Sequence, residues 1–97
     1  DVNRLIPIIV ADDSEYVRAI KVRVLTFGPL TEMLGAREIE VALGEGTTVM
    51  QLTERFQLIS MIESGLRVAI DGEITTNLGV PLHDAAEVAF LPPVSGG

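Results

Sequence analysis

Short segments in which apolar and polar residues alternate restrict the fold of this chain more than any other feature. In residues 37–43, Ile39, Val41 and Leu43 alternate with two glutamates and an alanine. Successive side chains of a strand point to opposite faces, so this alternation is typical of a sheet with one buried face. Strand-like composition recurs in three further segments, and we expect strands there as well: residues 21–27, 66–70 and 87–91.

A longer helical pattern lies between these segments. Thr48 and Gln51 match a capping box, in which the hydroxyl and the amide side chain pair with backbone donors at the start of a helix. Apolar residues then recur at spacings of three and four, which places them on one face of a helix. These residues are Val49, Leu52, Phe56 and Ile59.

Glycine and proline mark the boundaries of the other elements. Pro29, after Gly28, suits the first position of a short helix, and Gly35 suits a left-handed stop. Asp71 followed by Gly72 predicts a tight hairpin. Strands packed on one main amphipathic helix form an α+β fold with a sheet on one side and the helix on the other.

Residues 1–20 differ in pattern from the rest. An apolar stretch that includes Pro7 is followed by a polar break, where Asp13 or Ser14 is expected to cap a short helix through Ile20. This segment is interpreted either as a leader remnant or as an extra strand or arm that packs on a neighbour, and the residues do not decide between them. We therefore divide the chain into an N-terminal extension (1–20), a domain (21–92) and a C-terminal tail (93–97).

Composition excludes several classes of function. The chain has 97 residues, 47% of them hydrophobic, which is enough for one small domain with its own core. There are no cysteines, so disulfides, thiolate zinc sites and cysteine nucleophiles are excluded, and a cytoplasmic location is expected. The net charge of −7 disfavours nucleic acid and anionic membranes as partners. The acidity either assists binding to a basic protein or keeps the chain soluble. No apolar run reaches membrane-spanning length, and the N-terminal stretch does not match a signal peptide.

The last six residues have an unusual order. Pro92 and Pro93 form an extended stem that cannot rejoin the sheet. Gly96 and Gly97 have no side chains, so this end fits a channel too narrow for other residues. The alternative is an ordinary frayed terminus. Val94, which could anchor the stem, and Ser95 complete the tail.

The segment 87–97, EVAFLPPVSGG, resembles the C-terminus of the molybdopterin synthase sulfur-carrier family. The segment 21–27, KVRVLTF, and the end of the short helix at Leu34 and Gly35 resemble the same family. The resemblance covers residues 21–97 and leaves residues 1–20 unmatched. It implies a ubiquitin-like β-grasp fold, a mixed sheet packed on one main helix, with a flexible C-terminal Gly-Gly tail.

The resemblance also implies a reaction cycle in which this chain supplies no acid or base. A ubiquitin-activating-type adenylyltransferase would use ATP to adenylate Gly97, and a sulfur donor would convert the adenylate to a thiocarboxylate. The large subunit of molybdopterin synthase would then pass the sulfur to a cyclic pyranopterin monophosphate. Two small and two large subunits would assemble, with no metal or cofactor bound by this chain. His83 is expected to be a surface residue without a catalytic role.

The family meets its partners through a hydrophobic sheet surface beside the tail. Carried over by position, the resemblance implies a docking role for Phe27 and Leu91, and less directly for Leu30 and Ile74. The alternative is that all four are core residues. One departure from the family pattern is Ala85, which stands in a turn where the family commonly has glycine.

Other functions remain open at this point. A carrier for thiamine thiazole synthesis also ends in Gly-Gly, although such carriers usually lack the double proline at Pro92 and Pro93. A ubiquitin-like protein modifier would use the same activated terminus. A non-covalent β-grasp binding module would not need Gly97 at all.

Overall fold

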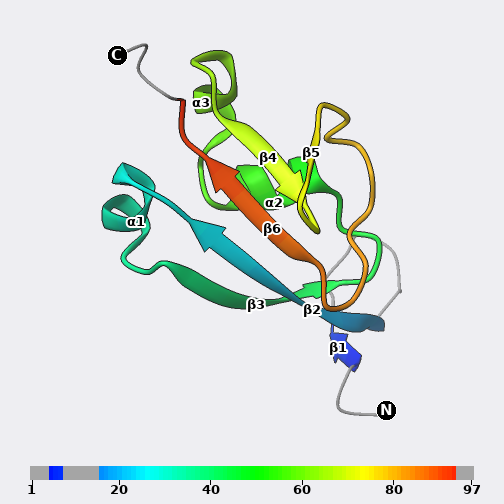
Figure 1. Cartoon of the computed structure of the whole chain (residues 1–97). Helices are drawn as coiled ribbons and strands as arrows, with labels where there is room; N and C mark the ends of the chain where they lie inside the picture. Colours follow the sequence, from blue (N-terminus) through cyan, green and yellow to red (C-terminus); the bar gives the residue numbers. More distant parts are fainter. Residues whose placement is uncertain (1–4, 8–15, 94–97) are drawn as a thin grey trace.

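The computed structural model of the chain describes residues 5–7 and 16–93, and these form a mixed sheet with helices on one face (Figure 1). Strand β2 pairs with β3 along one edge and with β6 along the other, and the order continues from β6 to β4 and β5. The strands of the sheet are β1 (Leu5–Pro7), β2 (Tyr16–Thr26), β3 (Glu38–Gly44), β4 (Arg67–Ile70), β5 (Glu73–Thr75) and β6 (Glu87–Leu91).

The two central strands run in parallel, and the other neighbours in the sheet are antiparallel. Residue Val24 of β2 lies opposite Val88 of β6, and Thr26 lies opposite Phe90. A parallel pair requires the chain to cross over the sheet between its strands. In this chain the crossover contains the helices, so the central pair and the helices enclose the core between them.

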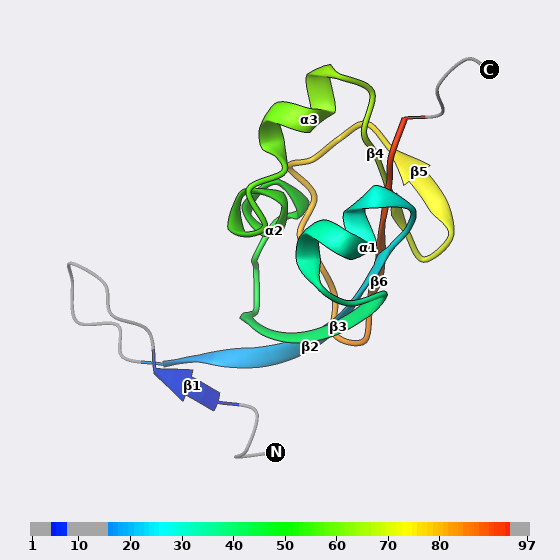
Figure 2. The same ribbon diagram turned by 90° about the vertical axis from the view of Figure 1, so that its left-hand side faces the viewer.

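Three short helices occupy the crossover side of the sheet (Figure 2). Helix α1 spans Pro29–Leu34, with Pro29 at its start and Gly35 in the left-handed conformation at its end. Helix α2 spans Val49–Arg55, and its Thr48 side chain accepts from the Gln51 N–H while the Gln51 side chain accepts from the Thr48 N–H. The start signals expected for both helices and the stop expected at Gly35 are confirmed. Helix α3 spans Ile59–Glu63.

The main helix is shorter than its apolar spacing predicts. The expected helical face extends to Ile59, but α2 ends at Arg55 and a separate α3 begins after Gln57, whose φ is 60°. Because of the break, Leu58 is completely buried in the core. An unbroken helix with this spacing would have placed Ile59 there instead. Burial of Leu58 therefore prevails over helix continuity, and the one main helix of the prediction is two helices.

The core lies between the sheet and the helices. Val24 and Val88 contribute to it from the sheet, and Val49 and Leu52 from α2. Phe90 lies edge-on to Phe56, with ring centroids 6.1 Å apart and planes at 66°. The predicted alternation in β2 and β6 is confirmed, because every second side chain enters this core.

The helix expected up to Ile20 is absent. Residues Tyr16 to Ile20 instead belong to β2, and β1 pairs with Tyr16, Val17 and Arg18 of that strand. β-Branched and aromatic residues favour a strand where a pairing partner exists, and β1 supplies that partner. The proposed caps at Asp13 and Ser14 lie outside the described residues. Residues 5–7 form a strand that pairs within the chain, and β2 continues without a break past residue 20.

No helix in the described part of the chain is long and apolar enough to cross a membrane.

Candidate functional site

The C-terminal stem leaves the sheet between two glycines. Strand β6 ends at Leu91, and Pro92 and Pro93 follow directly. A Cβ placed on Gly28 would lie 3.7 Å from Cγ of Pro92, and one placed on Gly65 would lie 3.0 Å from Cβ of Pro93. The stem is therefore seated where α1 begins and where the chain leaves α3. Both glycines have positive φ, 57° and 109°, which other residues adopt at a cost.

The remaining tail residues of the prediction lie outside the described residues. These are Val94, Ser95, Gly96 and Gly97. Of the predicted tail, the structure places the stem alone, with Pro92 half-buried and Pro93 exposed.

An apolar surface lies beside the stem, on the side of the sheet away from the helices. We call it the open face, and it begins with a row across four strands, Leu25, Ala89, Ala69 and Ile74, each opposite the next. Phe27 follows Leu25 by two residues, and Leu91 follows Ala89 by two, so both extend the open face toward the tail. The members of the open face are Leu25, Phe27, Ala69, Ile74, Ala89 and Leu91, of which Ala69 is itself buried.

Three of the four predicted docking residues lie on the open face. Phe27 is 46% exposed and Ile74 is 61% exposed, which is unusual for large apolar side chains. Leu91 is half-buried beside them. Leu30, in contrast, is completely buried in the core, so the docking role expected for it is wrong. The first turn of α1 directs Leu30 inward, and it acts as a core residue.

The sequence interpretation missed three members of the open face. Leu25 and Ala89 have the alternation signal, since each stands two residues before a predicted member. Ala69 has no such signal, because its place depends on β4 lying next to β6 with Ala69 opposite Ala89. Sequence spacing within one strand does not specify that pairing.

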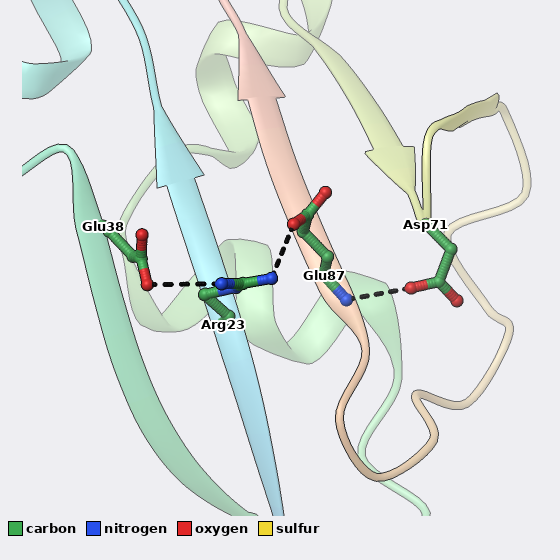
Figure 3. A network of polar contacts seen from close by, with 4 residues as sticks. All are labelled: Arg23, Glu38, Asp71 and Glu87. Atoms are coloured by element: carbon green, nitrogen blue, oxygen red, sulfur yellow. Dashed lines mark hydrogen bonds and ion pairs between the residues drawn. The ribbon is translucent and has the colours of Figure 1, made fainter.

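A belt of charged side chains borders the open face at the end away from the tail (Figure 3). Arg23 on β2 lies between two carboxylates, with Nη1 3.6 Å from Oε2 of Glu38 and Nη2 2.9 Å from Oε2 of Glu87. Lys21 lies 4.0 Å from Glu40 on the same face. These side chains are half or more exposed, apart from Glu87 at 38%, so the pairs contribute little to stability. They do fill this end of the face with polar groups.

A groove of about 430 Å³ lies at the root of the tail. Leu91 and Ile74 of the open face line it together with Arg67, which lies directly opposite Leu91 in the sheet. Gly65, Pro92 and Pro93 complete the lining. The groove thus joins the open face to the stem.

His83 is part of a hydrogen-bonded surface cluster, as expected. Its Nε2 lies 2.5 Å from Oδ2 of Asp71, and its Nδ1 donates to the Asp84 carbonyl at 2.7 Å. Oδ1 of Asp71 accepts from the Glu87 N–H at 3.0 Å (Figure 3). The hydrogen bond to Asp71 raises the pKa of His83, and the same bond lowers the pKa of Asp71. The cluster joins the β4–β5 hairpin to the loop before β6.

The turn at Ala85 has the backbone conformation that the family pattern suggests for glycine. Ala85 has a φ of 69°, and its N–H donates to the Lys21 carbonyl at 2.8 Å. The Lys21 N–H in turn donates to Oδ1 of Asp84 at 2.8 Å. This turn aligns β6 beside β2 and therefore sets the place from which the tail starts.

Within residues 5–7 and 16–93 no three His, Asp or Glu side chains are arranged as a metal site. Among these residues, the groups near the start of the tail are the open face, the guanidinium of Arg67 and the proline stem. Such an arrangement can bind a protein partner and present a terminus to it.

A mixed sheet packed on helices, with a C-terminal stem leaving a central strand beside an open apolar face, defines a ubiquitin-like β-grasp protein, which confirms the expected fold class. The chain belongs to the ThiS family, whose model matches residues 24–97. It is 33% identical over 81 residues to the molybdopterin synthase sulfur carrier subunit of Escherichia coli (strain K12), covering 78% of this chain and 99% of that protein. The resemblance seen in the sequence is thereby confirmed.

Solved structures show the same fold. The small archaeal modifier protein 1 of Methanosarcina acetivorans is 27% identical, with a TM-score of 0.60, over 82% of this chain and 99% of that one. A complex of subunits 1 and 2 of the molybdopterin-converting factor from Helicobacter pylori contains a chain that is 26% identical. That chain matches with a TM-score of 0.55, over 80% of this chain and all (100%) of its own.

Proposed function

We propose that this chain is the sulfur carrier of a molybdopterin synthase and that its working group is the carboxylate of Gly97. The observation that carries the proposal is the position of the Pro92–Pro93 stem. It leaves the sheet at the edge of an exposed apolar face instead of folding back onto the core. A partner that binds this face receives the tail in a defined direction. Family membership and the sulfur carrier named among the relatives support the same function.

The proposed cycle has three steps. The Gly97 carboxylate attacks the α-phosphorus of ATP on an adenylyltransferase, releasing pyrophosphate and forming an acyl-adenylate. A sulfur nucleophile at the oxidation level of sulfide displaces AMP and leaves a thiocarboxylate. The thiocarboxylate sulfur then bonds to a carbon of a cyclic pyranopterin monophosphate in the large subunit, and the carbon–oxygen bond at that carbon breaks as the leaving oxygen takes up a proton. Water cleaves the resulting acyl–sulfur bond and restores the carboxylate of Gly97.

The described residues contribute recognition to this cycle. Phe27 and Ile74 offer exposed apolar area of the kind that marks interfaces, and the charged belt around Arg23 borders it. Both partners, the activating enzyme and the large subunit, would bind the open face in turn. The Helicobacter pylori complex of subunits 1 and 2 supports the large subunit as a partner, and two copies of each subunit would form the assembly.

Intact mass provides the test. The chain is incubated with its activating enzyme, ATP and a sulfur donor, and we expect the mass to rise by the difference between sulfur and oxygen. The loaded chain is then mixed with the large subunit and the pyranopterin precursor, which should yield molybdopterin. A chain lacking Gly97 should remain folded and unloaded, since a terminal residue contributes little to stability. A chain that never gains sulfur would contradict the proposal.

A protein modifier is the second candidate, because one structural neighbour is named a small archaeal modifier protein. A modifier would use the same adenylate but transfer Gly97 to a lysine of another protein as an isopeptide. Conjugates that carry the Gly97 remnant would identify this function. A thiocarboxylate that forms without yielding molybdopterin would favour either this role or a carrier role in thiazole synthesis.

A further inference from the structure

Arg67 is the one basic residue among the described residues that line the groove at the start of the tail. It lies on β4 directly opposite Leu91, and its neighbour on the same face, Ala69, lies opposite Ile74. Alternation in the strand therefore directs Arg67 to the open face, next to Leu91 and Ile74. Arg67 is an exposed residue, and it lines the groove together with the stem residues Pro92 and Pro93.

The cations elsewhere on this face already have carboxylate partners, whereas Arg67 has none within the described residues. Arg23 lies 2.9 Å from Glu87, and Lys21 lies 4.0 Å from Glu40. The polar contact that Arg67 makes there is a long hydrogen bond, 3.4 Å from Nη1 to the Leu66 carbonyl. What distinguishes Arg67 is its position, because it lines an apolar groove together with Leu91, Ile74 and the stem.

We propose that Arg67 is a specificity-determining docking residue and that it binds an Asp or Glu side chain of an apolar segment on the large subunit. This inference rests on the proposed function and names the chemistry of the contact. The planar guanidinium binds a carboxylate through two parallel hydrogen bonds, which defines an orientation as well as a position. Apolar neighbours exclude water around such a pair, and arginine is common at the centres of interfaces for this reason.

The place of the pair gives it a second consequence. Arg67 and the stem line the same groove, so a carboxylate bound there fixes the partner relative to the point where the tail starts. The contact thus selects partners that are aligned with the start of the tail when they bind. An uncharged or basic residue at that point of a partner would leave Arg67 desolvated without a counter-charge, which disfavours the wrong partner.

Binding of the full chain to the large subunit tests the inference, measured by calorimetry over a series of salt concentrations. Arg67→Met keeps the length of the side chain and removes the charge, and we expect the affinity to fall by about tenfold or more. Arg67→Glu should weaken binding further, by about a hundredfold or more. Arg67→Lys keeps the charge without the planar fork and should lie between the wild type and the Met variant.

Arg55→Met is the matched control. Arg55 is also exposed and also makes no ion pair within the described residues, but it lies on α2, on the opposite side of the sheet. We expect unchanged affinity for this variant and an unchanged salt dependence. The wild type should lose affinity with salt more steeply than Arg67→Met, because one charge pair is screened in the wild type alone. Circular dichroism checks that each variant is folded.

The outcomes separate the inference from the proposed function. If the wild type binds and both Arg67→Met and Arg67→Glu bind equally well with the same salt dependence, the inference is overturned and the proposed function stands. If Arg55→Met weakens binding as much as Arg67→Met, the effect is one of net charge, and the inference is again overturned. If the wild-type chain does not bind the large subunit at all, the proposed function itself fails.

Discussion

Gly65 and Pro93 lie so close together that a Cβ at position 65 would be 3.0 Å from the Cβ of Pro93, which forces the proline to shift. We predict that Gly65→Ala displaces the stem. Positive φ at this residue costs alanine about 1–2 kcal/mol of stability, and the contact with Pro93 adds to that cost. A displaced tail should load sulfur more slowly, by up to about a hundredfold. The rate of thiocarboxylate formation measures the effect.

Gly35→Ala is the control for this prediction. Gly35 also follows a helix with positive φ, 82°, but a Cβ there would meet nothing within 4 Å. The two variants should lose similar stability from backbone strain, and Gly35→Ala should load at the wild-type rate. Equal loading rates for both variants would show that Gly65 has no influence on the tail.

Phe27 and Leu30 stand three residues apart and should respond to mutation in opposite ways. Phe27→Ala removes an exposed ring from the open face, so we expect affinity for the large subunit to fall by about ten- to a hundredfold. The melting temperature of the Phe27→Ala variant should change little. Leu30→Ala empties a fully buried site and should lower the free energy of unfolding by about 2–5 kcal/mol. Loss of stability in Phe27→Ala as large as in Leu30→Ala would assign Phe27 to the core.

Ala85 is held at a φ of 69°, where glycine is less strained. We predict that Ala85→Gly raises the free energy of unfolding by about 0.5–1 kcal/mol, after the larger entropy of glycine in the unfolded chain is subtracted. Ala42→Gly, on an exposed position of β3, should have the opposite sign. Chemical denaturation of the two variants measures both effects. A destabilised Ala85→Gly would mean that the turn is not strained.

The pair of His83 and Asp71 should make stability depend on pH. The pKa of His83 is raised in the folded protein. Its contribution to stability is therefore complete below the pKa in the unfolded chain, about 6.5, and is lost as pH rises through the raised pKa. The pKa of Asp71 is lowered, so its contribution is present above about 3.9 and is lost as pH falls through the lowered pKa. The pair therefore stabilises the fold most between about pH 4 and 6.5.

His83→Gln tests this window. Both side chains are about half exposed. We therefore expect His83→Gln to lower the free energy of unfolding by about 0.5 kcal/mol at about pH 5.5 and by almost nothing at about pH 9. Neutral imidazole has one N–H for its two acceptors, Asp71 and the Asp84 carbonyl, which is why the charged form is favoured. Denaturation midpoints at the two pH values measure the difference. A loss that does not change with pH would contradict the assignment.

Local signals in the sequence are sufficient for the starts of both predicted helices and for the end of the first. The capping box of Thr48 and Gln51 and the stop at Gly35 are predictable because each depends on residues within one turn of each other. Alternation assigned Phe27 and Leu91 to the outer face of their strands. Three expectations fail: the helix up to Ile20, the single main helix through Ile59 and the docking role of Leu30. A distant partner decides each outcome, since β1 pairs with the start of β2 and the core takes up Leu58 and Leu30.

The sequence alone therefore determined an α+β chain whose strands have one buried face and whose last strand is followed by a proline stem that cannot rejoin the sheet. Those properties follow from the period of the pattern and from the chemistry of proline and glycine. Only the tertiary structure decided that Gly65 and Arg67 lie beside the tail and that Ala69 joins the open face. These places depend on β4 pairing with β6 in one register. The pattern of apolar residues within a strand does not specify which distant strand it pairs with.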